Sequence, residues 1–149
     1  MIMSKHNNKI TEIDGIKFKS DLEARYYLLL KDRLEKSEIF DLVLQPKFEL
    51  IPGYIQNGKK IRPGHYVADF QFVEKRRENG QAHGVQVVVD TKGFFDSLGK
   101  WKIKHFQYLN PRIEFRLISY SKKDGGWIDY YDLQMLRKER KKAKSIGNK

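Results

Sequence analysis

The residues best suited to chemistry stand at the end of the most apolar stretch of the chain. The run from Val85 to Val89 is typical of a buried strand, and it continues directly into Asp90-Thr91-Lys92. Because side chains alternate along a strand, Asp90 and Lys92 share one face and lie about 7 Å apart along the chain. A carboxylate and an ammonium group at this spacing can hold a metal ion with a water molecule beside it, so this strand end is the first candidate site.

Two further acidic residues lie in apolar surroundings upstream. Asp69 interrupts the run Tyr66-Val67-Ala68-Asp69-Phe70-Gln71-Phe72, which predicts a second apolar strand. Glu23 falls inside the apolar arc of a predicted helix when residues are placed at about 100° per position. A lone carboxylate on a core-facing stripe costs free energy unless a positive group meets it. The alternative is that Glu23 is a capping-box acid, because it stands three residues after Ser20.

Length, charge and composition narrow the class of protein. The chain has 149 residues, 40% of them hydrophobic and 13% aromatic, which predicts one folded domain over residues 1–149. There is no cysteine, so disulfides and thiolate metal sites are excluded. No apolar run is long enough for a membrane span and no signal peptide opens the chain, so we expect a soluble protein of the cytoplasm, which is the host-cell cytoplasm if a phage encodes it. A net charge of +11 favours a polyanionic partner, most commonly nucleic acid.

The hydrophobic pattern predicts a mixed α/β fold. Residues 1–13 are polar and predicted to be frayed, residues 15–18 are predicted to be extended, and a polar loop at 75–83 containing Asn79-Gly80 predicts a hairpin. Helices are expected at 21–36, 97–109 and 132–144, and strands at 43–51, 65–73, 85–92 and 113–119.

The ordered set Glu23, Asp69, Asp90, Lys92 resembles the active-site pattern of the PD-(D/E)XK nuclease superfamily. Ser20-Asp21-Leu22-Glu23, Asp69-Phe70 and Asp90-Thr91-Lys92-Gly93 are similar to motifs of the phage endonuclease I type of Holliday-junction resolvase. The runs 44–50 and 66–70 are similar to those of a family of small phage nuclease-like proteins that were formerly uncharacterised. The resemblance spans residues 14–120. It departs at Ala68, where the superfamily has proline, and at Asp90, where glutamate is commoner.

This resemblance implies a restriction-endonuclease-like core, a mixed central sheet flanked by helices in the order αβββαβ. It also implies hydrolysis of DNA phosphodiester bonds with Mg²⁺ or Mn²⁺, which hard oxygen ligands suit. Asp69, Asp90 and the Thr91 carbonyl would hold the metal, and Glu23 would bind a second metal or orient its water. Lys92 would position or activate the attacking water and stabilise negative charge. The alternative for Asp90 and Lys92 is an exposed ion pair, worth less than about 1 kcal/mol.

Several other polar residues are candidates for contact with DNA. Gln45 resembles an accessory site position in some superfamily members, or is a solvated strand residue. Lys102 and His105 fall within the apolar arc of the second helix, which is set by Leu98, Trp101, Phe106 and Leu109. They either face a DNA phosphate or are a snorkelling lysine and a histidine with its hydrogen bonds satisfied. Lys100 and Lys104, on the opposite face, are either solvated or contact phosphate.

The segment 132–149 is expected to be a helix that ends in a flexible basic tail. Residues 137–149 contain one acid, Glu139, and seven basic residues that either contact DNA phosphates or serve only solubility: Arg137, Lys138, Arg140, Lys141, Lys142, Lys144 and Lys149.

Two classes of function stay open at this point. One is a metal-dependent endodeoxyribonuclease, structure-selective like a junction resolvase and used in phage recombination or DNA packaging; as a resolvase it would act as a homodimer on branched DNA. Within this class a single-strand, flap or sequence-specific nuclease is an alternative. The other class is a non-catalytic basic DNA-binding module on a nuclease-like fold. No glycine-rich phosphate loop is present, so an ATPase is not expected.

Overall fold

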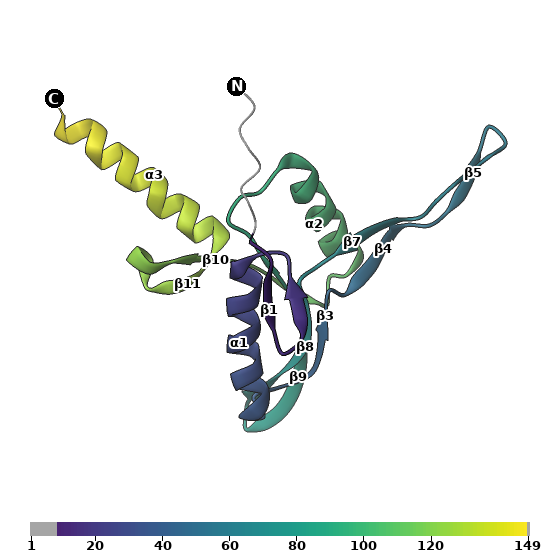
Figure 1. Ribbon diagram of the computed structural model, residues 1–149, viewed down its shortest axis with the longest axis horizontal. Helices are drawn as coiled ribbons and strands as arrows, with labels where there is room; N and C mark the ends of the chain where they lie inside the picture. The colour runs from purple at the N-terminus through teal and green to yellow at the C-terminus, as the bar shows by residue number, and fades with distance from the viewer. Residues whose placement is uncertain (1–8, 149) are drawn as a thin grey trace.

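The computed structural model describes residues 9–148 and has a mixed α/β architecture (Figure 1). A five-stranded mixed sheet, in the order β11-β10-β9-β8-β3, packs against three helices, as the sequence predicts. The helices are α1 (Asp21–Glu35), α2 (Ser97–Leu109) and α3 (Tyr130–Gly147), with a short 3-10 turn at Lys122–Asp124. The sheet strands are β3 (Ile39–Leu44), β8 (Phe70–Glu78), β9 (Gln81–Thr91), β10 (Glu114–Ser121) and β11 (Gly126–Asp129).

Three small antiparallel pairs lie outside this sheet. They are β1 (Thr11–Ile13) with β2 (Ile16–Phe18), β4 (Lys47–Ile51) with β7 (Gly64–Val67), and β5 (Tyr54–Gln56) with β6 (Lys59–Ile61). No helix within residues 9–148 is long and apolar enough to cross a membrane.

Two hydrophobic clusters fill the two faces of the sheet. Val87 and Val89 of β9 pack with Tyr26 and Leu30 of α1, whereas Val88 packs with Phe106 of α2. The alternation of side chains along one buried strand therefore places α1 and α2 on opposite faces. This explains why the valine run shows no alternation of apolar and polar residues, since both of its faces are covered.

The two strands expected upstream of Val85 are each divided in the structure. Residues 43–51 are not one strand, because Gln45 has a φ of 50° and Pro46 has no N–H to continue the ladder. Residues 65–73 divide at Ala68-Asp69, where the Ala68 N–H donates to Pro46 O and the Asp69 N–H donates to Val89 O. The chain therefore leaves the main sheet after β3, forms the β4–β7 and β5–β6 pairs, and returns at Asp69.

Other boundaries differ in ways that follow from local chemistry. The loop expected at 75–83 is only the turn Asn79-Gly80, whose positive φ angles of 50° and 78° suit a tight hairpin. Residues 11–13 are not frayed but pair with β2, while residues 1–8 lie outside the described part of the chain. Strand β11, which pairs with β10, has no counterpart among the predicted strands.

The C-terminal segment is helical over the expected residues 132–144, and the helix continues where a flexible tail was expected. Helix α3 begins after its N-cap Asp129 and continues to Gly147, beyond the expected end at Lys144. Figure 1 shows α3 extending away from the sheet on the side opposite the β5–β6 hairpin. Lys149 lies outside the described residues.

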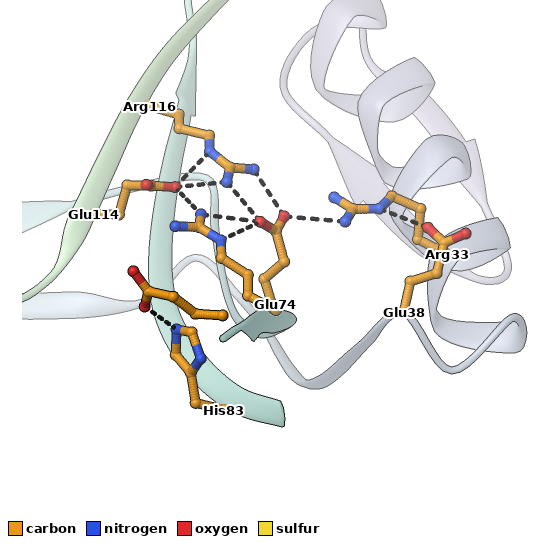
Figure 2. A network of polar contacts seen from close by, with 8 residues as sticks. Arg33, Glu38, Glu74, His83, Glu114 and Arg116 are labelled. Atoms are coloured by element: carbon orange, nitrogen blue, oxygen red, sulfur yellow. Dashed lines mark hydrogen bonds and ion pairs between the residues drawn. The ribbon is translucent and has the colours of Figure 1, made fainter. Parts of the chain in front are cut away.

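An ion-pair network fixes the C-terminal end of α1 to the sheet (Figure 2). Glu74 of β8 accepts hydrogen bonds from Arg33 of α1 and from Arg76 and Arg116, at 2.9–3.0 Å. Arg76 and Arg116 also bind Glu114 on β10. This attachment fixes the position of α1 against the sheet. The first turn of the helix, which carries Glu23, lies at the other end of α1.

Candidate active site

The predicted site residues meet at the end of the sheet where β9 stops. Leu44 at the end of β3 pairs with Phe70 at the start of β8, and Phe70 pairs with Val89. Antiparallel pairing therefore places Gln45, Asp69 and Asp90 at the same end of three neighbouring strands. The topology, rather than proximity in the sequence, brings them together.

Asp90 is the most enclosed acid of this group. Its side chain is 2% exposed and lies on the α2 face, like Val88. Tyr66 donates a hydrogen bond of 2.6 Å to Asp90 Oδ2. Asp90 Oδ1 is buried and accepts no hydrogen bond within the described part of the chain, although Lys92 Nζ lies 3.0 Å away as an ion pair. One oxygen of Asp90 is thus held by a neutral donor and the other is open to a cation.

Asp69 is fixed by the residue that follows Asp90. Its Oδ2 accepts hydrogen bonds from the Thr91 N–H at 2.7 Å and from Thr91 Oγ1 at 2.8 Å. Burial, together with the charges of Asp90 and Glu23, raises the pKa of Asp69 to about 8 against the effect of these hydrogen bonds. Threonine at position 91 therefore orients Asp69 through its side chain, a role that the sequence pattern does not indicate.

Glu23 and Lys92 belong to the same electrostatic unit. Burial raises the pKa of Glu23, with Lys92 acting against this effect and Asp90 adding to it. Burial alone would lower the pKa of Lys92, but the carboxylates of Asp90, Asp69 and Glu23 outweigh it and raise that pKa overall. Lys92 is therefore a fixed cation at neutral pH.

The backbone of Lys92 is held by β10. The Lys92 N–H donates 2.9 Å to Ile118 O, and the Ser119 hydroxyl donates to the Lys92 carbonyl. Ser119 is buried, and nothing in its sequence neighbourhood marks it. Tyr66 is a second site residue that no sequence pattern identifies, and only the tertiary placement of β7 near β9 reveals it.

A cleft of about 290 Å³ opens onto Asp90 and Lys92. Lys102 lines this cleft, so the structure brings this predicted lysine to the site, whereas His105 is half-buried outside it. The other residues that line the cleft come from β7, from the segment before α2 and from the first half of α2, and they are His65, Tyr66, Val67, Phe95, Asp96, Leu98, Gly99 and Ile103.

Residues predicted to contact DNA fall into three groups. Gln45 is exposed, and its N–H donates 2.9 Å to Asp69 O. Lys100 and Lys104 are exposed on α2. On α3, Arg140 binds Asp124 and is not a free cation, while Lys142 is exposed. The other basic residues of α3 line an open groove of about 560 Å³, together with Lys123 and Gln134, and these are Arg137, Lys138, Lys141 and Lys144.

The donor set fits a hard divalent cation held by two carboxylates. No group of three or more His, Cys, Asp or Glu side chains within residues 9–148 forms a ready metal cage. Mg²⁺ is commonly bound through only one or two carboxylates, with waters completing its shell. Asp90 Oδ1, which has the Lys92 ammonium group beside it but accepts no hydrogen bond, and Asp69, whose pKa is raised by burial and neighbouring acids, are groups that such a cation would satisfy.

Comparison with known proteins gives one match. The family described as "Protein of unknown function (DUF1064)" matches residues 3–126, which is most of the chain. No curated protein and no solved structure matches the chain significantly. The chain therefore belongs to the DUF1064 family.

Proposed function

We propose that this protein is a metal-dependent endodeoxyribonuclease of the PD-(D/E)XK type. The observation that carries the proposal is the meeting of Asp69, Asp90 and Lys92 at one end of the sheet, with an open carboxylate oxygen beside a cation. The observed order α1, β3, β8, β9, α2, β10 is that of the predicted core. The excess of basic residues matches a polyanionic substrate.

The residues of the site divide the chemistry between them. Bound Mg²⁺ or Mn²⁺ would supply a water of lowered pKa and neutralise charge on the scissile phosphate. Asp69 and Asp90 would hold the cation, with the Thr91 carbonyl as a further ligand, and Glu23 would bind a second cation or orient the water. Tyr66 and Thr91 keep the two aspartates in place.

Lys92 acts as a cation rather than as a general base in this proposal. Its raised pKa keeps the ammonium group charged at neutral pH. The group can therefore donate to the attacking water and stabilise the negative charge that develops on the phosphate. Its backbone is anchored to β10 on both sides, so the position of the ammonium group is restricted before substrate binds.

The preferred substrate in this proposal is branched DNA, as for a junction resolvase in phage recombination or packaging. We assign no base-reading role to the described residues of the site, so selection in this proposal rests on the shape of the DNA. Single-stranded, flap and sequence-specific duplex DNA are the alternatives within the nuclease class.

A cleavage panel tests the proposal. Junction, flap, single-stranded and duplex DNA are incubated with Mg²⁺ or Mn²⁺, and with excess chelator. We expect metal-dependent cleavage, its loss in Asp69→Ala and Asp90→Ala, and a large rate loss with little loss of binding in Lys92→Ala. Asp32→Asn, at an exposed ion pair on α1, is the matched control and should cleave normally.

Three results would contradict the mechanism. Full activity in chelator would exclude the metal. Weak binding but full cleavage rate at saturating DNA in Lys92→Ala would reduce that lysine to a phosphate contact. Tight DNA binding with no cleavage of any substrate would favour a non-catalytic DNA-binding module.

A further inference from the structure

The outward face of α2 carries large apolar side chains that the core does not use. Only Ile103 and Phe106 of this helix are buried. Trp101 is 67% exposed and Tyr108 is 83% exposed, although the sequence pattern places Trp101 in the core-facing arc. Exposing two large aromatic rings on one helix costs free energy that a bound partner would recover.

Four of these exposed side chains are here called the aromatic stripe: Phe94, Leu98, Trp101 and Tyr108. Leu98, Trp101 and Tyr108 follow one another at intervals of three and seven residues, which places them along one side of the helix. Trp101 and Tyr108 are two helical turns apart, about 10.5 Å along the axis. Phe94, 75% exposed, extends the stripe into the segment between β9 and α2.

Basic side chains border the stripe, and no acid lies on the helix. Residues 97–109 contain Lys100, Lys102 and Lys104 and neither aspartate nor glutamate. Lys104 Nζ lies 5.3 Å from the centre of the Trp101 ring. A second copy of this chain would bring the same lysines and a further net charge of +11 against this face. The charge therefore favours a polyanion over self-association.

The stripe leads into the candidate active site. Leu98 and Lys102 line the cleft that holds Asp90 and Lys92. Phe94 follows Lys92 by only two residues. A nucleic acid with a phosphate in the cleft would thus lie beside the aromatic rings of α2.

We propose that the aromatic stripe binds unpaired nucleotides of DNA by stacking, and so selects substrates that contain unstacked bases next to the cleaved phosphate. The inference rests on the proposed nuclease function for its location, but the binding it describes needs no catalysis. Intact duplex hides the faces of its bases, whereas single strands, flaps and open junction centres expose them. Stacking on an aromatic side chain tolerates any base, which suits a site without base-reading groups.

Binding measurements without metal test the stripe separately from cleavage. A labelled short oligothymidylate and a duplex of equal length are titrated in chelator at about physiological salt. Trp101→Leu keeps an apolar side chain but removes the ring, and it should weaken oligothymidylate binding by about 5- to 100-fold. Trp101→Phe keeps a ring and should retain most of the affinity. Tyr54→Ala removes an exposed aromatic ring from β5 and is the matched control, with affinity unchanged.

Fluorescence gives an independent readout. The chain has two tryptophans, and Trp127 packs against Tyr26 and Tyr120, so Trp127→Phe keeps a ring in that aromatic cluster and leaves Trp101 as the sole reporter. Oligothymidylate should quench Trp101 strongly, and duplex DNA should quench it little.

Several outcomes would overturn the inference. Equal affinity of wild type and Trp101→Leu would do so, as would tighter binding of the duplex. Loss of a dimer in Trp101→Leu by sedimentation would make the stripe an interface between copies. If the stripe binds oligothymidylate as expected but no substrate is cut, the nuclease proposal fails and the stripe stands. If DNA is cleaved as proposed but substitution of Trp101 changes neither binding nor quenching, the stripe inference fails and the nuclease proposal stands.

Discussion

At the residue scale, Glu23, Asp69 and Asp90 place three carboxyl groups around the single ammonium group of Lys92. Burial and the mutual repulsion of these acids raise the pKa of Asp69 to about 8. The uncharged residues Tyr66 and Thr91 donate hydrogen bonds to Asp90 and Asp69, respectively. Neutral donors therefore hold the site in position, and its carboxyl groups outnumber the neighbouring ammonium group. A bound cation would relieve the repulsion between these carboxyl groups.

Tyr66→Phe tests whether the tyrosine orients Asp90. It removes the 2.6 Å hydrogen bond and leaves a buried carboxylate oxygen without its donor. Partners of this kind typically contribute 10–100-fold in metal affinity or activity, so we expect a loss of about that size in a metal titration of cleavage. Tyr130→Phe, which removes the hydroxyl of another tyrosine of the core, is the control. Unchanged metal dependence in Tyr66→Phe would contradict the role.

The raised pKa of Asp69 predicts how stability depends on pH without metal. Its ordinary value of 3.8 applies to the unfolded chain, whereas the folded value is about 8. The folded state thus binds more protons between these values, so metal-free stability falls as pH rises from about 4 to about 8. Asp69→Asn keeps an oxygen for Thr91 but carries no charge, and its melting temperature in chelator should fall less over this range. An equal slope in both proteins would show that Asp69 is ionised throughout.

At the element scale, the two ends of α1 have different neighbours. Its first turn places Glu23 at the site, and its last turns join the sheet through the network of Figure 2. Arg116, Arg33 and Arg76 donate to Glu74 and hold its pKa at about 2, below the usual 4.5, although burial opposes this shift. The network therefore stabilises the protein above about pH 4.5, and that contribution is lost as pH falls toward about 2.

Glu74→Gln should weaken this attachment. The change keeps the shape of the side chain but removes the charge that three arginines share. We expect a loss of about 1–3 kcal/mol in the free energy of unfolding at pH 7, and a smaller loss at pH 3. Denaturant unfolding at both pH values measures it, with Asp32→Asn at the exposed pair with Lys36 as the control. Equal losses at the two pH values would mean that the charge is not responsible.

At the scale of the whole molecule, positive charge extends well beyond the site. The open groove along α3 carries Arg137, Lys138, Lys141 and Lys144, and the ion pair of Arg140 with Asp124 fixes this helix to the rest of the chain. Phosphate contacts of this kind add affinity that is independent of sequence and sensitive to salt. A helix held in this way presents them at a fixed position, as a flexible tail would not.

Lys141→Gln with Lys144→Gln tests the groove. We expect weaker binding to all forms of DNA, an unchanged preference among them, and a salt dependence whose slope falls by about 1 for each phosphate that the variant no longer neutralises. Lys75→Gln with Arg77→Gln removes the same charge from the far end of β8 and should change affinity little. A double variant that keeps its affinity but loses its preference for branched DNA would assign selectivity to α3.

The assembly state follows from the proposed substrate. Resolution of a junction requires two cuts, and one site per chain implies a twofold dimer. Sedimentation should therefore give twice the chain mass, either for the free protein or for its junction complex. A monomer in both conditions would contradict paired cutting and favour a single-strand or flap nuclease.

Local sequence patterns were enough to predict most elements, and the resemblance to a nuclease superfamily supplied the candidate site residues. Val87 to Val89 indicate a buried strand, the spacing of Asp90 and Lys92 gives them a shared face, and residues 97–109 are predicted as a helix with the observed ends. These are local properties, because periodicity and turn chemistry depend on neighbours along the chain.

Contacts between distant segments could be read only from the folded chain. The Tyr66 hydroxyl reaches Asp90 from β7, which pairs with β4 and not with β9, and the Ser119 hydroxyl reaches the Lys92 carbonyl from β10. No local pattern specifies either contact. The exposed face of α2 has the apolar spacing of a core helix, but the orientation of this helix against the sheet leaves Trp101 facing solvent. Hydrophobic periodicity shows that a helix has an apolar face, whereas the packing of the remaining elements determines whether that face is buried.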